Sequence, residues 1–434
     1  MTRSLRAFVV AFSLVASVAS AQPLPTATPE SVGMSTTRLG RMHAGMQSLV
    51  DTHLVGGIVT LVARDGKMVD LQTFGFQDAD AKTPMKTDSI FRIASMSKPI
   101  TSVAVMMLFE EGKLALTDPV SRFIPAFRDM KVLTRGPAGT EPTLQPARRQ
   151  ITVRDLLTHR SGLTYGFLDG AQVGKAYRDG GVNDGLTVVE VPLEEGIDRL
   201  AKAPLVSQPG AEWHYSLSTD VLGRVVEVAS GTAFDRYLEE RVFKPLHMTD
   251  TSFSVPDAKW SRFVTVYTGD GQGGIRAMKD PESFGNTYMS PMTSYKTGKL
   301  YFSGGAGLAS TAQDYSRFAQ MLLNGGALDG VRLLGPKTVQ LMTVSHTLDL
   351  NLANTIVLGA GAEWGLGFKI TSDLGASQLP GSVGMYGWSG IYGTFFWVDP
   401  KEKLIGVMMV QRYPGPPAAA PFQTLTYQAI TSMK

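Results

Sequence analysis

The sequence predicts an α+β fold whose antiparallel sheet is built from both ends of the chain. Strand-like apolar runs occur before residue 80 and again after residue 365, whereas helical patterns dominate between them. Amphipathic helical patterns at 35–53 and 422–433 lie outside both groups of strands. We therefore expect helices to flank the sheet and a mostly helical segment to be inserted between its two halves.

The first expected elements are a helix and a hairpin. Apolar residues recur at helical spacing within 35–53. Asp65-Gly66 then separates two β-rich segments, 58–64 and 68–76, and Asp-Gly is a strong signal for a hairpin turn. This part of the chain is expected to form one edge of the sheet core.

The middle of the chain, about 116–300, alternates helical patterns with long loops that contain glycine and proline. Thr152 is a plausible cap for the first helix of this segment. The pieces predicted here are helices over 151–159, 221–229 and 233–242, and loops over 135–150 and 254–300.

The last third of the chain returns to strands. Thr311 is expected to cap a helix that ends at Leu323. The strands predicted after it cover 365–370, 383–388, 394–398 and 404–410. Residues 31–434 are thus expected to form one unit, with an α/β part over about 31–115 and 301–434.

Residues 1–21 have the pattern of a secretory signal. Two arginines precede an apolar stretch over 7–18, and Ala19-Ser20-Ala21 supplies the small residues of a cleavage site. The apolar stretch is too short for a comfortable membrane span. We predict cleavage between Ala21 and Gln22, a secreted, periplasmic product without a stable membrane anchor, and a linker over 22–30.

Composition excludes several classes of function. The 41 basic and 38 acidic residues nearly balance, and no basic patch stands out, so nucleic acid is not an expected partner. The chain has no cysteine, which excludes disulfides, thiol catalysis and thiolate metal sites. Its six histidines show no zinc-binding spacing, and we expect no metal or cofactor.

The chemistry is expected at Ser95 and Lys98, which form the only Ser-x-x-Lys of the chain and precede an apolar run over 103–109. Their spacing places both on one face of a helix. A serine hydroxyl needs an adjacent base, and a lysine serves when burial depresses its pKa. The N–H groups at a helix N-terminus favour a developing oxyanion. Because Ser-x-x-Lys also arises by chance, partners for Ser95 are needed elsewhere.

Two further stretches supply such partners. Tyr215 precedes a predicted helix, and a phenol beside a lysine ammonium has a lowered pKa and can exchange protons. Trp388-Ser389-Gly390 and Ile391 form a glycine-rich turn after a predicted strand, where backbone N–H groups can approach a substrate. The alternative interpretation is an ordinary packing tyrosine and an ordinary turn.

Together these motifs resemble those of serine hydrolases of the class C β-lactamase and penicillin-binding-protein superfamily. Ser95-Met96-Ser97-Lys98, Tyr215-Ser216-Leu217 and Trp388-Ser389-Gly390 follow one another in the order found there. The stretches ITVRDLLTHRSGL at 151–163 and GGAGLASTAQDYSRF at 304–318 match as well. The chain is most similar to family VIII carboxylesterases of the EstB type, over most of the predicted mature sequence.

The resemblance implies a β-lactamase/transpeptidase-like fold and assigns a role to each motif. Ser95 would be the acylated nucleophile, and Lys98 would accept or relay its proton. Tyr215 would act as general base and then as acid, while the backbone N–H groups of Ser95 and Ile391 would form the oxyanion hole. Either Lys98 or Tyr215 could be the immediate base. The implied substrate-binding residues are Trp388, Ser389, Gly390 and Leu217.

Two positions depart from the β-lactamase pattern. Leu217 replaces the asparagine of Tyr-x-Asn, and Trp388 replaces the lysine of Lys-Thr-Gly. A charge-assisted hydrogen bond is worth roughly 1.5–3 kcal/mol, so its loss disfavours anionic substrates relative to neutral esters. A literal Lys-Thr-Gly at 296–298 precedes the GGAGLAS segment and is not expected to function. We interpret His159 and His214 as structural, with His214 nearer the cleft.

The expected function is therefore a secreted serine carboxylesterase whose partner is a small, short-chain or compact neutral ester. A β-lactamase or D-Ala-D-Ala carboxypeptidase is the closest alternative, and Leu217 and Trp388 argue against it. An acyltransferase needs only an alcohol or amine in place of water. A catalytically inactive binding protein on the same fold is disfavoured by Ser95, Lys98 and Tyr215.

Overall fold

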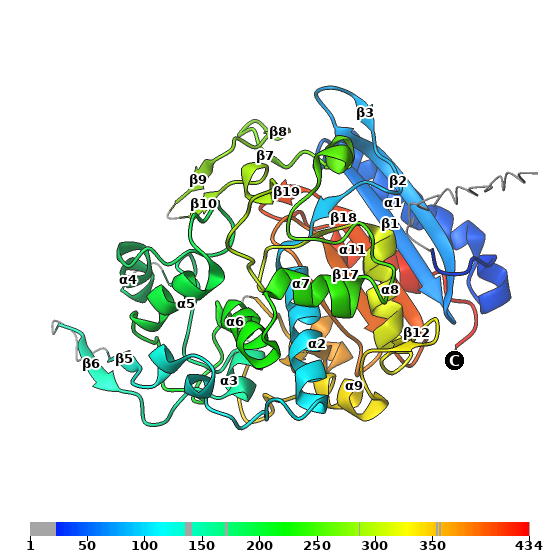
Figure 1. The fold of residues 1–434 in the computed structure, drawn as a ribbon. Coiled ribbons are helices and arrows are strands. Elements are labelled where there is room, and N and C mark those ends of the chain that lie inside the picture. The colour runs from blue at the N-terminus through cyan, green and yellow to red at the C-terminus, as the bar shows by residue number, and fades with distance from the viewer. Residues whose placement is uncertain are drawn as a thin grey trace, which may run out of the picture.

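The computed structural model describes residues 23–134, 141–169, 172–285, 287–352, 355 and 357–433. An eight-stranded antiparallel sheet forms its centre, with helices on both faces and a further group of helices to one side (Figure 1). The predicted signal peptide and the Ala21–Gln22 cleavage site lie outside the described residues.

The central sheet joins strands from both ends of the chain, as expected. Strand β1 (Gly57–Arg64) lies between its hairpin partner β2 (Lys67–Asp78) and the C-terminal strand β18 (Leu404–Val410). In order across the sheet, the strands are β14 (Ala362–Trp364), β15 (Lys369–Thr371), β16 (Tyr386–Ser389), β17 (Phe395–Asp399), β18, β1, β2 and β3 (Thr83–Pro84).

Strand β1 is buried throughout and mostly apolar because it is covered on both sides. Ile58 and Val62 point to one hydrophobic cluster, and Val59 and Leu61 to another, as the alternation of side chains in a strand requires. Strand β18 divides its side chains between the same two clusters.

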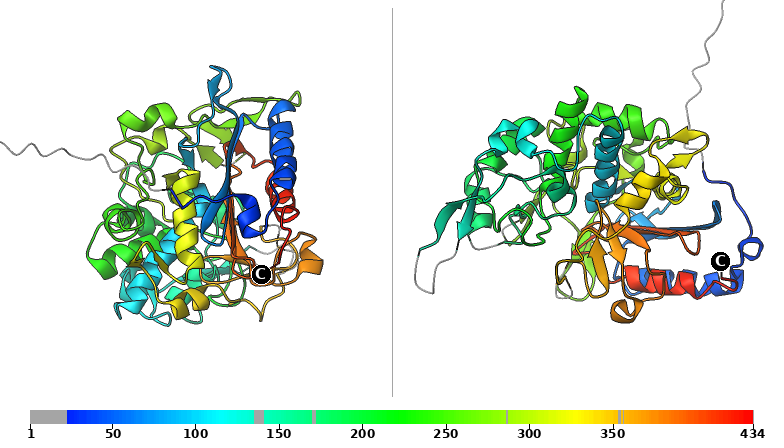
Figure 2. Two further views of the ribbon diagram at one scale, coloured as in Figure 1. Left: turned by 90° about the vertical axis from the view of Figure 1, so that its right-hand side faces the viewer. Right: turned by 90° about the horizontal axis from the view of Figure 1, so that it is seen from below.

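The terminal helices share one face of the sheet. Helix α1 (Thr36–Asp51), capped by the Ser35 side chain, packs beside α11 (Ala419–Tyr427), as the blue and red ribbons in Figure 2 show. On the opposite face lie α2 (Ser97–Glu110) and α8 (Ala312–Leu323), the latter capped by Thr311 as predicted. The two ends of the chain are thus tied together through one sheet.

The inserted segment contributes most of the remaining helices. The helices outside the pairs above are α3 (Val153–Leu157), α4 (Val173–Asp179), α5 (Leu193–Ala201), α6 (Ser218–Ser230), α7 (Phe234–Leu238), α9 (Pro336–Met342) and α10 (Leu374–Ser377). Thr152 caps α3 in a full capping box. Helix α6 packs against α2, so the inserted segment lies directly against the helix that follows Ser95.

Short strands complete the chain outside the central sheet. They are β4 (Phe91–Arg92), β5 (Lys131–Thr134), β6 (Thr143–Pro146), β7 (Tyr267–Gly269), β8 (Ile275–Ala277), β9 (Glu282–Phe284), β10 (Thr287–Met289), β11 (Ala309–Ser310), β12 (Ala327–Leu328), β13 (Val331–Arg332) and β19 (Arg412–Tyr413). The loop predicted over 135–150 therefore contains the returning strand β6 of a hairpin, and the one predicted over 254–300 contains β7 to β10.

The strand predicted over 365–370 is wrong for most of its length. Residues 365–368 form the bend between β14 and β15. Gly367 has φ +92°, and a Cβ there would lie 2.1 Å from the Ser102 Oγ of α2. Only glycine therefore fits this bend, because the bend packs directly against α2. The last helix also begins and ends earlier than predicted, at 419–427 instead of 422–433.

The residues expected to form a linker are packed against the sheet from Leu24 onward. Leu24 is buried, and the Met68 N–H donates to the Pro25 carbonyl at 2.7 Å. The Ala27 N–H donates back to the Met68 carbonyl at 3.1 Å. This stretch therefore extends the edge of β2. Within the described residues, no helix is long and apolar enough to cross a bilayer.

Candidate active site

Ser95 lies where the chain turns from a short strand into the central helix. β4 pairs with β11, and a 3₁₀ turn, Ala94–Met96, then leads into α2. Ala94 has φ +42°, a left-handed conformation that a residue with a side chain adopts at a cost. Ser95 is the middle residue of this 3₁₀ turn and α2 follows the turn directly, so Ser95 stands at a helix N-terminus as predicted.

Lys98 is fully buried and holds three oxygen atoms together. Its Nζ donates to the Ser95 Oγ at 3.2 Å, to the Tyr165 hydroxyl at 2.9 Å and to the Gly305 carbonyl at 2.9 Å. The three-residue spacing therefore does place the amine beside the serine hydroxyl.

The charge on Lys98 is weakened by its surroundings. Burial lowers the pKa of Lys98 toward neutral pH, and the negative charge of Asp220 partly opposes this shift. Asp220 is itself fully buried at the start of α6, and burial raises its pKa above the usual value for aspartate. A buried lysine of this kind can be neutral at physiological pH and serve as a base.

Tyr215 lies across the site from Ser95, with Lys98 over its ring. The Lys98 Nζ is 4.5 Å from the Tyr215 ring centroid, and the Trp388 Nε1 donates to the Tyr215 hydroxyl at 3.1 Å. Burial raises the pKa of Tyr215, and hydrogen bonds with Ser95 and Trp388 only partly offset this. The expectation of a lowered tyrosine pKa is therefore wrong, because desolvation outweighs the effect of a lysine that is itself weakly charged.

An aromatic cluster fixes the position of Tyr215. His159 is buried, its ring centroid lies 4.9 Å from that of Tyr215, and its Nδ1 lies 3.1 Å from the Ser216 Oγ. Trp213 and Trp364 pack against the same imidazole. Burial and the nearby Lys98 lower the pKa of His159, so the ring stays neutral, in keeping with a structural role.

A cavity of about 210 Å³ opens over Ser95. Thirteen residues line it, and they come from all three predicted motif regions: Ser95, Tyr165, Phe167, Leu168, Asp184, Leu186, Tyr215, Ala306, Val357, Trp388, Ser389, Gly390 and Ile391. Residues far apart in the sequence thus meet around one hydroxyl group.

Leu217 is not among the described residues that line this cavity, which corrects its assignment to substrate binding. It is buried in the main hydrophobic cluster and forms the N-terminal boundary of α6. Its N–H donates to the Thr164 carbonyl, so the chain turns into the helix directly after Tyr215 and carries the Leu217 side chain inward.

The turn after β16 is held against the segment that precedes Ser95. A Cβ on Gly390 would lie 2.4 Å from the Ile93 carbonyl oxygen, so only glycine allows this approach. The Thr394 Oγ1 donates to the same carbonyl at 3.2 Å. Ile391 therefore lines the same cavity as Ser95, and its role in an oxyanion hole stays a prediction.

Sequence reasoning missed Tyr165, Gly305 and Asp220. Tyr165 follows the matched stretch 151–163 by two residues, and Gly305 is the second residue of the matched stretch 304–318. Position and spacing could have pointed to both. Asp220 read as an ordinary acidic residue in the first turn of a helix, and only its burial distinguishes it.

Gly305 is predicted to be essential for the geometry of this site. A Cβ there would lie 2.6 Å from the Asp220 Oδ2 and 2.9 Å from the Tyr165 hydroxyl. It would also lie 3.3 Å from the Lys98 Nζ. Gly305→Ala should therefore displace the amine from Ser95 and lower kcat/KM roughly a hundredfold, since misplacement by about 1 Å costs that much.

The control for this measurement is Gly40→Ala on the exposed side of α1, where a Cβ would meet nothing within 4 Å. It should leave kcat/KM unchanged and stabilise α1 by about 0.5–1 kcal/mol in a denaturant titration. Native-like kinetics in both glycine variants would contradict the role given to Gly305.

The literal Lys-Thr-Gly at 296–298 is exposed and is not among the described residues that line the Ser95 cavity, as expected. No group of three or more metal-ligating side chains occurs within the described residues.

Comparisons with known proteins agree with this geometry. Residues 44–427 match the family model described as Beta-lactamase. The chain is 37% identical over 382 residues to Protein Rv1367c of Mycobacterium tuberculosis, covering 86% of this chain and 89% of that one. It is 36% identical to Esterase EstB of Burkholderia gladioli over 368 residues, covering 81% and 85%.

A solved structure extends the comparison to three dimensions. EstCE1, described as a hydrolase with promiscuous acyltransferase activity, superposes with a TM-score of 0.79 at 28% identity, over 90% of this chain and 98% of that one. The sheet, the flanking helices and the inserted helices thus form a β-lactamase/transpeptidase-like α+β fold. The chain belongs to the Beta-lactamase family of serine hydrolases and is a homologue of esterase EstB.

Proposed function

We propose that this protein is a carboxylesterase that hydrolyses neutral esters with compact acyl groups through an acyl-enzyme on Ser95. One observation carries the proposal: the Ser95 Oγ lies 3.2 Å from a buried lysine amine, in a small cavity. Trp388 lines this cavity at the position where the β-lactamase motif has a lysine. The similarity to Esterase EstB supports it.

Acylation follows from the positions of three side chains. The amine of Lys98 takes the proton of the Ser95 hydroxyl as the oxygen attacks the ester carbonyl. The carbonyl oxygen becomes an oxyanion held by the N–H groups of Ser95 and Ile391. As the C–O bond to the alcohol breaks, Tyr215, kept neutral by burial, gives its proton to the leaving oxygen.

Deacylation reverses these transfers. Acylation leaves a Lys98 ammonium beside a Tyr215 phenolate, and the two charges stabilise each other across the short distance between amine and ring. The phenolate removes a proton from the attacking water. When the second tetrahedral intermediate collapses, the Lys98 ammonium returns a proton to the Ser95 oxygen, and both side chains regain their starting state.

The charge of the cavity favours neutral substrates. Asp184 is the one carboxylate among the described residues that line the cavity. No lysine or arginine is among them. Burial raises the pKa of Asp184 to about 6, so it carries substantial negative charge at neutral pH. A β-lactam carboxylate would meet this charge without a compensating cation.

Acyl transfer to an alcohol is the second candidate function. EstCE1, which combines hydrolase with acyltransferase activity, shares this fold at 28% identity. An alcohol that replaces water at the Tyr215 phenolate would accept the acyl group by the same sequence of steps.

Paired kinetics test the proposal. We expect purified protein to hydrolyse p-nitrophenyl butyrate with a kcat/KM at least about a hundredfold above that for nitrocefin, since the cationic contact for the β-lactam carboxylate is missing. The opposite ranking would contradict the esterase assignment. Addition of a primary alcohol during ester turnover distinguishes transfer from hydrolysis, because only transfer yields a new ester.

Export is part of the proposal. The signal-like pattern of residues 1–21 supports secretion to the periplasm, with a mature chain that begins at Gln22. N-terminal sequencing of the protein recovered from a periplasmic extract should begin at Gln22. Recovery only in the cytoplasm with Met1 intact would overturn this part.

A further inference from the structure

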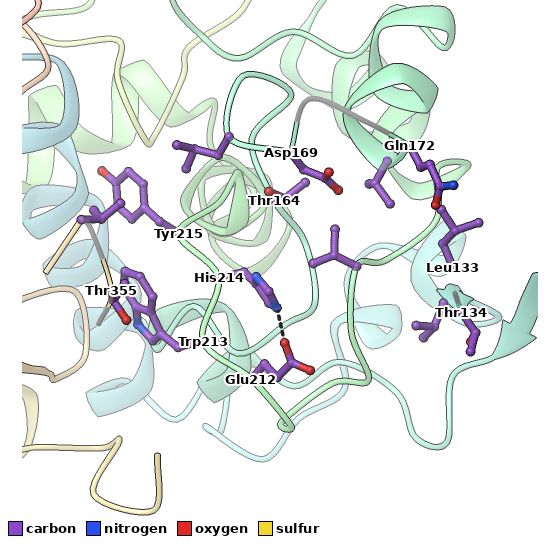
Figure 3. A pocket seen from close by; sticks show the side chains of 15 residues that line it. Leu133, Thr134, Thr164, Asp169, Gln172, Glu212, Trp213, His214, Tyr215 and Thr355 are labelled. Atoms are coloured by element: carbon purple, nitrogen blue, oxygen red, sulfur yellow. Dashed lines mark hydrogen bonds and ion pairs between the residues drawn. The ribbon is translucent and has the colours of Figure 1, made fainter. Parts of the chain in front are cut away.

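A second and larger pocket, of about 690 Å³, lies beside the Ser95 cavity. Figure 3 shows it with Tyr215 at one end and the strand residues Leu133 and Thr134 at the other. The Tyr215 hydroxyl points away from this pocket, toward the site around Ser95. No step of the mechanism above uses this space.

The two cavities adjoin each other. Leu168, Tyr215 and Val357 line both, so a single layer of side chains separates them. Leu168 is 45% exposed and lies in the loop that follows Tyr165. A ligand with its ester at Ser95 therefore reaches the larger pocket by passing over these three side chains.

The chemistry of the site determines which half of an ester lies there. The oxyanion-hole groups at Ser95 and Ile391 hold the carbonyl, and the leaving oxygen must lie within hydrogen-bond reach of the Tyr215 hydroxyl. The larger pocket is lined by Tyr215 and by the three residues before it, Glu212-Trp213-His214. Because the Tyr215 hydroxyl faces Ser95 and not this pocket, an alcohol whose oxygen lies at that hydroxyl reaches the pocket by extending past the Tyr215 ring, over Leu168 and Val357.

We propose that the larger pocket is the binding subsite for the alcohol half of the ester, and that it takes a bulky, largely apolar alcohol while the acyl group remains compact. The inference rests on the proposed esterase function and adds the substrate class. The acyl group is then assigned to the cavity of about 210 Å³ around Ser95, which has less than a third of the volume of the larger pocket.

The walls of the pocket indicate the polarity of this alcohol. Val132, Leu133, Val173, Val206 and Trp213 supply apolar surface. Two polar atoms of the lining, the Trp213 Nε1 and the Gln172 Oε1, are buried without a hydrogen-bond partner within the described residues. Neither atom has accessible surface in the pocket, so the surface offered to a ligand by these walls is mainly apolar and favours an apolar alcohol.

The charged groups at the pocket exclude anions. Asp169 and Glu212 contribute two carboxylates, and the His214 Nε2 donates to the Glu212 Oε2 at 3.0 Å. Even with a protonated His214, the lining carries no net positive charge. Neutral or cationic alcohols are therefore accepted, and alcohols with a carboxylate or sulfonate are repelled.

A pair of isomeric esters tests the assignment. 2-(2-Naphthyl)ethyl acetate carries its bulky group on the alcohol, and ethyl 2-naphthylacetate carries it on the acyl half. We expect kcat/KM for the first to exceed that for the second by at least about tenfold, because one pocket fits the ring system and the other does not. Equal values or the reverse preference would overturn the inference.

Tryptophan substitutions that fill the larger pocket test whether the preference between the two esters arises there. Val206→Trp should lower kcat/KM for naphthylethyl acetate by about tenfold or more and leave that for ethyl acetate, whose alcohol is too small to need the pocket, within about twofold. Leu133→Trp, which enters from a different wall, should act in the same way. Val228→Trp, the same substitution at a 40% exposed position on α6, is the matched control and should change neither value.

The outcomes separate this inference from the function on which it rests. Turnover of p-nitrophenyl butyrate without a preference between the isomers, or a preference that neither tryptophan variant reduces, overturns the inference alone. Absence of Ser95-dependent turnover of every ester overturns the proposed function and this inference with it. Retained turnover of ethyl acetate, followed by acid release in a pH-stat, shows that a variant is folded.

Discussion

Replacement of Ser95 by alanine should abolish ester hydrolysis while leaving the fold intact. The Ser95 hydroxyl is the group placed to form the acyl-enzyme, 3.2 Å from the Lys98 amine. The Tyr165 hydroxyl also lies at this amine, at 2.9 Å, but burial raises the pKa of Tyr165, so that phenol stays protonated. We expect kcat to fall at least about a thousandfold, as for other serine hydrolases that lose their nucleophile. The release of p-nitrophenol from p-nitrophenyl butyrate measures kcat for both proteins.

Covalent labelling shows which serine reacts. A fluorophosphonate should add one adduct to the native protein and none to Ser95→Ala in intact mass spectra. Ser97→Ala is the matched control, because the Ser97 Oγ is buried and accepts the Leu308 N–H at 3.1 Å. It should lose about 1–3 kcal/mol of stability from the unpaired N–H and still be labelled. Labelling of Ser95→Ala would contradict the assignment.

Replacement of Lys98 by arginine should have the next largest effect. A guanidinium remains protonated at every accessible pH, so it cannot accept the Ser95 proton even if it keeps the charge. Lys98 is fully buried between three oxygen atoms, and the planar, larger group also fits them poorly. We expect kcat/KM to fall by roughly a hundred- to ten-thousandfold, the range for loss of a general base.

The pH profile of the native enzyme provides an independent readout of Lys98. Because burial lowers the pKa of Lys98 to about 7, the amine is protonated and inactive below that pH and free above it. The value of kcat/KM should therefore rise with pH and level off above about 7. A profile flat from pH 5 to 9 would contradict a lysine base.

Asp220→Asn should shift this profile in a defined direction. The negative charge of Asp220 raises the pKa of Lys98, so its removal should lower that pKa and move the acidic limb to lower pH. A purely structural role for Asp220 would lower the plateau without moving the limb. Native-state stability measured in parallel separates the two effects.

The local sequence accounts for most elements of the fold. Helix α1, the β1–β2 hairpin around Asp65-Gly66 and the Thr311-capped helix α8 follow from periodicity, turn residues and caps, which act over a few residues. The expected sheet from both ends of the chain is confirmed by the pairing of β1 with β18. The helices and the hairpin depend on local sequence. The sheet depends on apolar strands that must be buried on both faces.

The sequence by itself also determined the proposed chemistry, since Ser95, Lys98 and Tyr215 predict it through their residue types and order. Only the tertiary structure decided how the groups are tuned. Burial, which no spacing reveals, sets the lysine pKa low and the tyrosine pKa high, and it converts Asp220 from a helix-start residue into a buried charge. The Leu217 side chain lies in the core because the chain turns into helix α6 directly after this residue, where the Leu217 N–H donates to the Thr164 carbonyl.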